Sequence, residues 1–347
     1  NPSKYQIPIN YAIEPNGFSI IWANGKNLFP GDSVVNPEPS SLTTYVNSLH
    51  SNFKLNKYQE EIALFNTDGV LVDSITYQNQ ITDISFGRSP DGSGSFFFFG
   101  DPTPLGPNSV LGFQDTIRSL NPQFSHLGGA YNQSLSITLL SQNLSSSIYY
   151  TLDGSNPNIF SLQYSSPIEI HNNTVLKAIN IDSTSLPSRV ITNTYFINET
   201  FDLPAISISI DPEFLWDDEI GIYVEGGSED VYGWNCFQNW ERPANIEFFN
   251  TNGEIIFNNG IGLKIHGSSS RALPQKSFAI FARNKYGSNY MNYKFFEDKN
   301  IIEHKSLILR NSGYDWRKTL IRDGLSHTLI ADNLDVDYQS YQPSAVY

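Results

Sequence analysis

Short runs of alternating hydrophobic and polar positions fill the first part of the chain, and turn residues separate them. Residues 60–77, EEIALFNTDGVLVDSITY, contain two such runs joined at Asp68 and Gly69, which is a strong hairpin signal. Asn24 and Gly25 give a second turn signal after the run GFSIIW. Short strands and regular turns of this kind predict a β-sandwich over residues 1–112.

The same pattern continues over residues 122–198. The run SIYYTLDGSNPN ends in a tight turn at Asp153 and Gly154, and the runs TVLKAINID and SRVITNTYFI follow it. These runs predict a second all-β sandwich. A calcium loop is the alternative for Asp153, Asn156 and Asn158, but the EF-hand spacing is absent and a turn is the better interpretation.

Residues 203–347 mix strands with at least one helix. In DWRKTLIRDGLSHTLIADN the apolar residues Ile321, Leu325 and Leu329 recur every four positions, which predicts a helix with one apolar stripe. Asp315 is its predicted N-cap. We therefore expect a multidomain fold in which two all-β immunoglobulin- or fibronectin-like sandwiches precede an α+β lobe.

Composition and charge narrow the class of partner. The formal net charge is −14 and the isoelectric point is about 4.8, so the chain repels polyanions and we expect no nucleic-acid partner. No apolar run has the length of a membrane-spanning helix, so we expect no membrane span. Cys236 is the single cysteine, which excludes an internal disulfide framework. Because the first residue is not Met and the last residues look like the inside of a strand, we expect an internal fragment.

The segment IHGSSSRALPQKSFAIFA carries candidate chemistry. As a strand it places Lys276, Phe278 and Ile280 on one face, and a lysine there is desolvated unless an anion lies near it. The residues just upstream are small or cationic: Gly267, Ser268, Ser269, Ser270 and Arg271. Small residues, backbone donors and a guanidinium are the chemistry that binds phosphate. The alternative is a β-turn followed by a lysine whose stem covers apolar surface.

Two parts of the chain resemble known β-domains. In the first, EIALF, VDSITY, FGRSPDG and PTPLGPN occur in the order seen in the lamin-tail domain, an immunoglobulin-like sandwich. In the second, YYTLDGSNPN, TVLKAINI and TYFI resemble the fibronectin-like domain at the C-terminus of chitobiases and hexosaminidases. That domain is usually a spacer beside another module, so the resemblance implies little chemistry for residues 122–198.

Residues 203–347 resemble a third family. GIYVEGG, NWERPANIEFFN, GIGLKIHGSSSRALPQKSFAIFARNKYG, SLILRNSGYDW and LIRDGLSHTL occur in the order typical of the spore-coat protein H (CotH) family, which has an atypical kinase-like fold. The resemblance implies that Lys276 and the 267–271 loop bind the phosphates of ATP with Mg, and that the γ-phosphoryl group passes to Ser or Thr of a protein. It also implies a truncated lobe whose catalytic and metal-binding aspartates lie beyond Tyr347, so we expect phosphoryl transfer and tight binding of Mg·ATP only in the longer parent protein.

Some features leave alternatives open. The family's loop commonly reads Arg-Gly-Asn-Ser-Ser, whereas this chain has His266 and Ser268 at the first and third positions, which favours a non-catalytic adhesive or structural scaffold. Asp323 is either a brace to an arginine, the favoured interpretation, or the acidic partner of the nucleotide lysine, as on kinase αC helices. The domain combination implies a secreted or cell-surface bacterial protein with a protein substrate or a surface partner.

Overall fold

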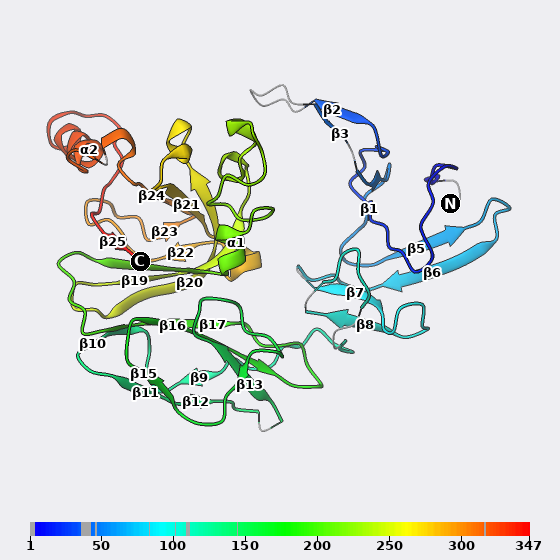
Figure 1. Cartoon of the computed structure of the whole chain (residues 1–347), viewed down its shortest axis with the longest axis horizontal. Coiled ribbons are helices and arrows are strands. Elements are labelled where there is room, and N and C mark those ends of the chain that lie inside the picture. Colours follow the sequence, from blue (N-terminus) through cyan, green and yellow to red (C-terminus); the bar gives the residue numbers. More distant parts are fainter. Residues whose placement is uncertain are drawn as a thin grey trace. The chain divides into compact units, whose positions relative to one another are not determined.

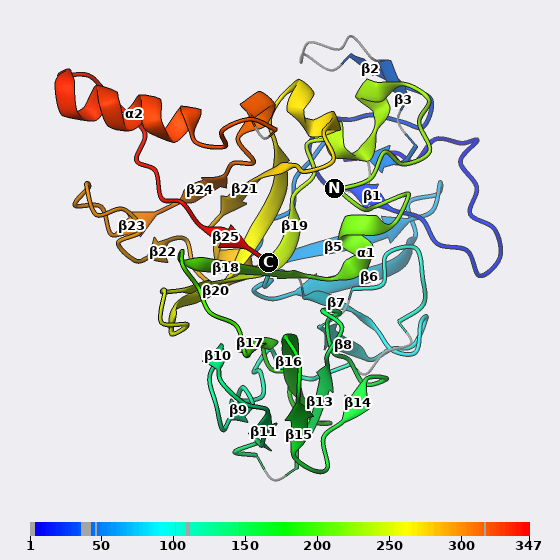
Figure 2. The same cartoon turned by 60° about the vertical axis from the view of Figure 1, so that its left-hand side comes forward.

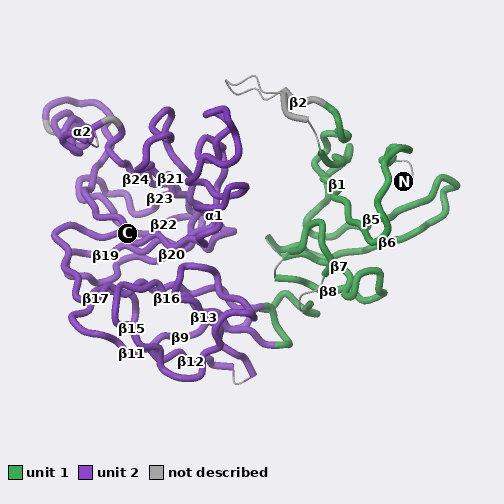
Figure 3. The backbone as a smooth tube through the Cα atoms, in the orientation of Figure 1, with its two compact units in different colours: residues 1–118, 183–186 green, residues 119–182, 187–347 purple. Residues whose placement is uncertain are grey.

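The chain folds into two compact units. A computed structural model describes residues 4–35, 43–45, 47–82, 84–100, 102–108, 112–143, 145–315 and 317–347. One unit contains residues 1–118 with 183–186, and the other contains residues 119–182 with 187–347 (Figure 3). The fibronectin-like region and the lobe that follows it therefore belong to the same unit.

The first unit is built from short strands. Its described strands pair two by two: β1 (Ile21–Trp22) with β4 (Leu49–His50), β2 (Ser33–Val35) with β3 (Thr43–Tyr45), β5 (Glu60–Phe65) with β6 (Leu71–Tyr77), and β7 (Ser85–Arg88) with β8 (Phe96–Phe99). The hairpin predicted at Asp68 and Gly69 is confirmed, because it joins β5 to β6 and Gly69 has a φ of +77°. Ile84, Phe113 and Leu186 form a small buried core.

The second unit begins with the predicted fibronectin-like sandwich. Its larger sheet has the order β10 (Gly129–Tyr131), β17 (Ile191–Ile197), β16 (Thr174–Ile181), β13 (Ser147–Thr151) and β14 (Leu162–Gln163). The smaller pairs are β11 (Leu135–Ile137) with β15 (Ile168–Ile170), and β9 (Gln123–Phe124) with β12 (Leu139–Leu140). Alternation along the strands buries Ile137, Ile170 and Leu176 in one shared core, so the all-β class predicted here is confirmed.

A six-stranded sheet forms the rest of the second unit. Its order is β24 (Ser306–Leu309), β21 (Ser277–Phe281), β20 (Ile255–His266), β19 (Arg242–Phe249), β18 (Ala205–Ile210) and β25 (Ala345–Val346). A smaller pair, β22 (Met291–Asn292) with β23 (Glu303–His304), lies outside this sheet. One face of the six-stranded sheet is apolar and nearly fully buried at Ile246, Leu263 and Ile280, and Phe214 of α1 (Pro212–Trp216) packs against it. Strands with added helices confirm the predicted α+β lobe.

The sandwich covers only part of the opposite face of this sheet. Strands β16 and β17 of the sandwich lie beneath β18, β19 and β20 (Figures 1 and 2). Farther along β20, Lys264 and His266 point to this same face, because they alternate with the buried residues Leu263 and Ile265. The sandwich thus supports one part of the face and leaves the end near the serine-rich loop uncovered by it.

The helix predicted to start at Asp315 starts later. Helix α2 spans Arg322–Asn333 and its N-cap position is Ile321, so the predicted N-cap is wrong. The carboxylate of Asp315 instead accepts a hydrogen bond from Thr319 Oγ1 at 2.5 Å and one from the backbone N–H of Arg322 at 3.3 Å. These bonds hold the preceding residues in a turn. Ile321, Leu325 and Leu329 are about half exposed, at 51%, 50% and 56%.

The described helices are short. Of these helices, none has both the length and the apolar character that crossing a bilayer requires.

Candidate functional site

The serine-rich loop joins β20 to β21. Gly267 opens it with a φ of +121°, and Ser269–Ala272 form a single 3₁₀ turn, η3. A Cβ on Gly267 would collide with the hydroxyl of Ser270, so glycine is required there on two counts. The turn is closed by the N–H of Arg271, which donates to the carbonyl of Ser268 at 3.1 Å.

The side chains of Arg271 and Lys276 donate hydrogen bonds to backbone carbonyls of this loop and of the segments next to it. Arg271 donates through Nε to the carbonyl of Gly267 at 2.6 Å and through Nη1 to that of Phe237 at 2.9 Å. Lys276 donates through Nζ to the carbonyls of Arg271 at 2.7 Å and Leu273 at 2.9 Å. Both cations thus satisfy backbone oxygens of the loop and its neighbour, and they fix its backbone path.

The surroundings of Lys276 are partly apolar. Its Nζ lies 5.1 Å from the centre of the Tyr223 ring, and its backbone N–H donates to the Tyr223 hydroxyl at 3.0 Å. Burial lowers the pKa of the ammonium, while Cys236 and Glu225 act in the opposite direction. The desolvation predicted for this lysine is therefore present, and carbonyl oxygens compensate for it.

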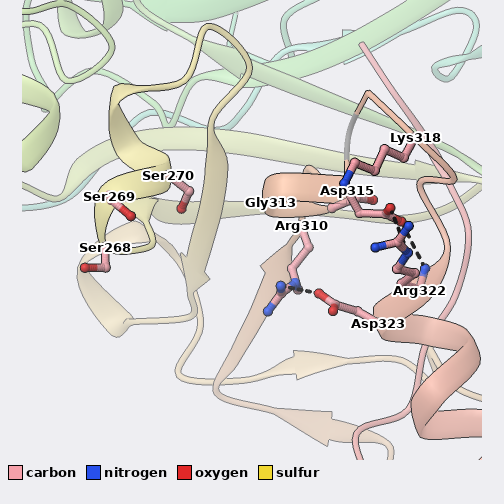
Figure 4. A pocket seen from close by; sticks show the side chains of 10 residues that line it. Ser268, Ser269, Ser270, Arg310, Gly313, Asp315, Lys318, Arg322 and Asp323 are labelled. Carbon is pink, nitrogen blue, oxygen red and sulfur yellow. Dashed lines mark hydrogen bonds and ion pairs between the residues drawn. The ribbon is translucent and has the colours of Figure 1, made fainter.

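A pocket of about 440 Å³ opens beside the loop (Figure 4). Its lining combines hydroxyls, cations and carboxylates: Ser268, Ser269, Ser270, Arg310, Ser312, Gly313, Asp315, Lys318, Arg322 and Asp323. Figure 4 shows the serines on one side and the two arginine–aspartate pairs on the other. Of the six residues predicted to bind nucleotide, the three serines line this pocket, whereas Gly267, Arg271 and Lys276 are not part of its lining.

Arg310 and Asp323 form one of these pairs. Arg310 directly follows β24, Asp323 lies in the first turn of α2, and an ion pair joins their side chains. The two side chains are 47% and 50% exposed. The predicted arginine–aspartate brace is confirmed, with Arg310 as the arginine; the Lys276 ammonium donates to the loop carbonyls instead.

Asp315 and Arg322 form the second pair, with 3.2 Å between Arg322 Nε and Asp315 Oδ1. The hydroxyl of Thr319 is the main cause that lowers the pKa of Asp315, and the N–H groups of the turn and the Arg322 charge lower it further. Lys318 adds a third cation to the lining. The pocket therefore holds three fixed positive charges and two carboxylates.

The open face of the sheet adds positive charge near the pocket. The pKa of His266 is lowered first by burial and then by the charges of Arg310, Arg271 and Lys264. The sequence interpretation missed Lys264, Arg310, Lys318 and Arg322. The alternation of Lys264 and His266 with buried neighbours was a local signal for the first of these.

The site fits phosphate better than it fits a metal ion by itself. Hydroxyls, two guanidiniums and an ammonium are the donors that bind phosphate oxygens. Within the described part of the chain, no group of three or more His, Cys, Asp and Glu side chains is arranged to hold a metal ion. The two pocket carboxylates are already engaged with arginines.

The loop at residues 153–158, for which the sequence left a calcium site as the alternative, contains the ammonium of a lysine. Lys177 is 3% exposed and donates to the carbonyl of Gly154 at 2.6 Å and to Asn156 Oδ1 at 3.3 Å. Burial lowers the pKa of Lys177 to about 8. Asp153 accepts from the N–H of Ser155, as in an Asx turn, so the turn interpretation is confirmed.

This site lies in a β-sheet lobe whose serine loop and helix flank a cationic pocket, and the sandwich before it is fibronectin-like. Residues 263–347 match the family model described as CotH kinase protein, and residues 137–195 match the model described as Fn3 associated. A search of curated proteins gives no match. The CotH resemblance is confirmed for the segment that contains the site, and the fibronectin-like character is confirmed upstream of it. The lamin-tail and chitobiase-type assignments stay predictions.

Proposed function

We propose that the CotH-type region binds the phosphate groups of ATP in the pocket between the serine loop and α2. One observation carries the proposal: the loop of Ser268–Ser270 and the Arg310–Asp323 pair form opposite walls of the same pocket. The role is that of the phosphate-binding part of a kinase that phosphorylates Ser or Thr of a protein.

The order of elements supports this assignment. In protein kinases a small-residue loop covers the phosphates, a basic residue on a later strand contacts them, and an acidic residue on the next helix pairs with that base. Here the serine loop between β20 and β21 comes first, Arg310 follows β24, and Asp323 is on α2. Arg310 and Asp323 thus supply the base–acid pair, with Arg and Asp in place of the usual Lys and Glu.

The six residues predicted from sequence then divide by role. Ser268, Ser269 and Ser270 present backbone and hydroxyl groups to the phosphates. Gly267, Arg271 and Lys276 shape the loop from behind, through the glycine conformation and the bonds to carbonyl oxygens. A guanidinium can donate two parallel hydrogen bonds to two oxygens of one phosphate group. Arg310 is therefore the strongest single candidate for direct contact with the phosphates of ATP.

Mg²⁺ accompanies ATP in such reactions and neutralises charge on its phosphates. The described residues supply phosphate contacts rather than a set of metal ligands. The role proposed for them is to bind and orient the nucleotide. We also propose a secreted or cell-surface location, on the combination of β-domains and the net charge of −14.

Titration calorimetry of the full 347-residue chain tests the proposal. Wild-type chain is titrated with Mg·ATP and, without metal, with tripolyphosphate, beside R310M and the control R283M. Arg283 pairs with Glu241 and does not line the pocket. We expect R310M to weaken binding at least about tenfold, since a charge-assisted contact contributes roughly 1.5–3 kcal/mol. Equal effects of R310M and R283M, or no saturable binding, would overturn the proposal.

A non-catalytic surface scaffold is the second candidate. The His266 departure favours it, and so does the engagement of Arg271 and Lys276 with backbone carbonyls. It predicts a folded chain that binds neither Mg·ATP nor tripolyphosphate. The same titration therefore separates the two candidates.

A further inference from the structure

A carboxyl group is fully buried where the fibronectin-like sandwich meets the six-stranded sheet. Glu247 lies in the second half of β19, on the face that turns toward β17, and its exposed fraction is 0%. Among its neighbours along the strand, Phe248 turns to the opposite, apolar core. A glutamate with no exposure needs hydrogen-bond partners, and the sandwich and strand β20 both supply them.

Thr194 of β17 supplies two of the hydrogen bonds. Its backbone N–H donates to Glu247 Oε1 at 3.1 Å, and its hydroxyl lies 2.5 Å from Oε2. The same hydroxyl is 2.8 Å from the hydroxyl of Ser207 on β18. Asn258 of β20 donates at 3.5 Å to Oε1 and at 2.9 Å to the carbonyl of Thr192. One side chain therefore links strands of both regions.

The surroundings leave no room for solvent at the carboxyl. A Cβ on Gly128 would lie 2.8 Å from Glu247 Oε1 and 2.9 Å from the carbonyl oxygen of Thr194, so only glycine fits there. Beside this polar contact, Phe196 of β17 packs edge-on against Phe201 and Phe249, with ring centres 5.0 and 5.3 Å apart. The hydrogen bonds of Glu247 thus lie inside a close-packed boundary between the two regions.

Among the residues that the structure describes, the groups that act on the Glu247 charge do not include a cation. Burial raises the pKa of Glu247 to about 7, and the two Thr194 bonds only partly oppose this. Strand β17 also presents Tyr195, whose pKa is raised by burial, by Tyr131 and by this carboxyl. Strands β18 and β20 present Ser207 and Asn258, which do not titrate, and the segment before β10 presents Gly128.

We propose that Glu247 is a pH-operated latch between the fibronectin-like region and the kinase-like sheet. Protonated, the carboxyl stays buried against Thr194 and the boundary is closed. Ionised, it carries an unpaired buried charge and favours opening of the boundary to water. The latch depends on geometry in both regions and is independent of any nucleotide.

The direction of the pH effect follows from proton linkage. In the opened state the carboxyl has an ordinary pKa near 4.5, whereas in the closed state its pKa is about 7. The latch is fully effective below the lower value and weakens up to about tenfold per pH unit as the pH rises to the upper value. Above about pH 7 no further change is expected from this group.

The latch also connects to the phosphate pocket. Strand β20 runs from Asn258 at the boundary to His266, the residue before the serine loop, a distance of about 26 Å along the strand. The sandwich therefore fixes one end of the strand whose other end carries the loop. The fibronectin-like region is a support for the sheet, not a detached spacer.

Hydrogen exchange on the full chain at pH 5, 6, 7 and 8, corrected for intrinsic rates, tests the latch. Peptides covering 126–131 and 191–197 are compared with peptides from the sandwich core. We expect wild-type protection at the boundary to fall from pH 5 to 7, up to about 100-fold in total, and then to level off. E247Q should remove this slope, and E241Q, which changes a carboxylate outside the boundary, should keep it.

A second variant keeps the test decisive if E247Q does not fold. T194V removes the hydroxyl donor to the ionised carboxylate, so it should raise the pKa of Glu247 and extend the slope above pH 7. Wild-type protection without pH dependence at these peptides would overturn the proposal. So would a slope that is the same in E247Q, or one that still ends near pH 7 in T194V.

Discussion

The ammonium of Lys276 donates to the carbonyl oxygen of Arg271 at 2.7 Å, so the cation that sequence reasoning assigned to phosphate holds the backbone of the serine loop. A second bond reaches Leu273 at 2.9 Å. The lysine points to the side of Tyr223, and the pocket lining does not include it. Lys276 can therefore contribute to the proposed phosphate site without lining it, because it fixes the backbone of the loop that carries the serines.

K276M should destabilise the second unit. The substitution leaves two loop carbonyls without their donor, and an unsatisfied, partly buried polar group costs roughly 1–3 kcal/mol. Urea unfolding measures the loss. K294M is the matched control, since Lys294 pairs with Glu297, which is 90% exposed, and its loss should change stability by less than about 0.5 kcal/mol. If K276M leaves stability unchanged yet abolishes ATP binding, Lys276 contacts the nucleotide directly.

G267A should distort the serine loop. Gly267 has a φ of +121°, and an added Cβ would meet the Ser270 hydroxyl, so alanine is strained by roughly 1–3 kcal/mol. Thermal unfolding and hydrogen exchange over residues 265–276 measure the effect. G227A is the control, because nothing lies within 4 Å of a Cβ at Gly227. Equal melting temperatures for the two variants would contradict the strain argument.

The sequence correctly predicted features that depend on residues close to one another in the chain. The hairpin at Asp68 and Gly69 is set by its own turn residues. Lys276 directly precedes β21, and its ammonium lies beside the ring of Tyr223, which packs against the apolar core, as the alternation predicted. The helix start was missed because the Asp315 carboxylate binds Thr319 and closes a turn before α2. That bond competes with the helix that the periodicity alone predicts.

The missed parts depend on contacts between distant segments. Arg310 and Asp323 meet only after β24 joins the sheet edge and α2 crosses near it. Glu247 looks like an ordinary outward residue of an alternating strand, and only the fold places Thr194 over it. No local pattern distinguishes an open face from one that a preceding domain covers.

D323N should strengthen the binding of phosphate ligands in the absence of metal. The Asp323 carboxylate competes with an incoming anion for Arg310, and both side chains are about half exposed, at 47% and 50%. We expect a few-fold tighter binding of tripolyphosphate, consistent with a pair that contributes at most about 1 kcal/mol, and little change in the free energy of unfolding. Calorimetry at low salt measures the affinity.

E297Q is the matched control for D323N, because it makes the same change of net charge at an exposed carboxylate that does not line the pocket. A general effect of net charge would give both variants the same gain. A gain confined to D323N supports competition at Arg310, and weaker binding by D323N would mean that Asp323 orients Arg310 for the ligand.

The turn before α2 should loosen at acid pH. The Thr319 hydroxyl and the Arg322 charge lower the pKa of Asp315 below its unfolded value near 3.9. Stability from this group is therefore present above that unfolded value and is lost as the pH falls through the lower, folded one. Hydrogen exchange over residues 312–330 between pH 2.5 and 5 should show protection that decreases toward acid pH.

D315N removes this titration, so its protection over residues 312–330 should be low and should not change with pH. The Glu247 latch responds in the opposite direction, since its raised pKa makes the boundary tighter as the pH falls toward 4.5. Because the two groups lie in different peptides, one exchange experiment separates them. Parallel pH slopes at both peptides would indicate general acid unfolding and would contradict both assignments.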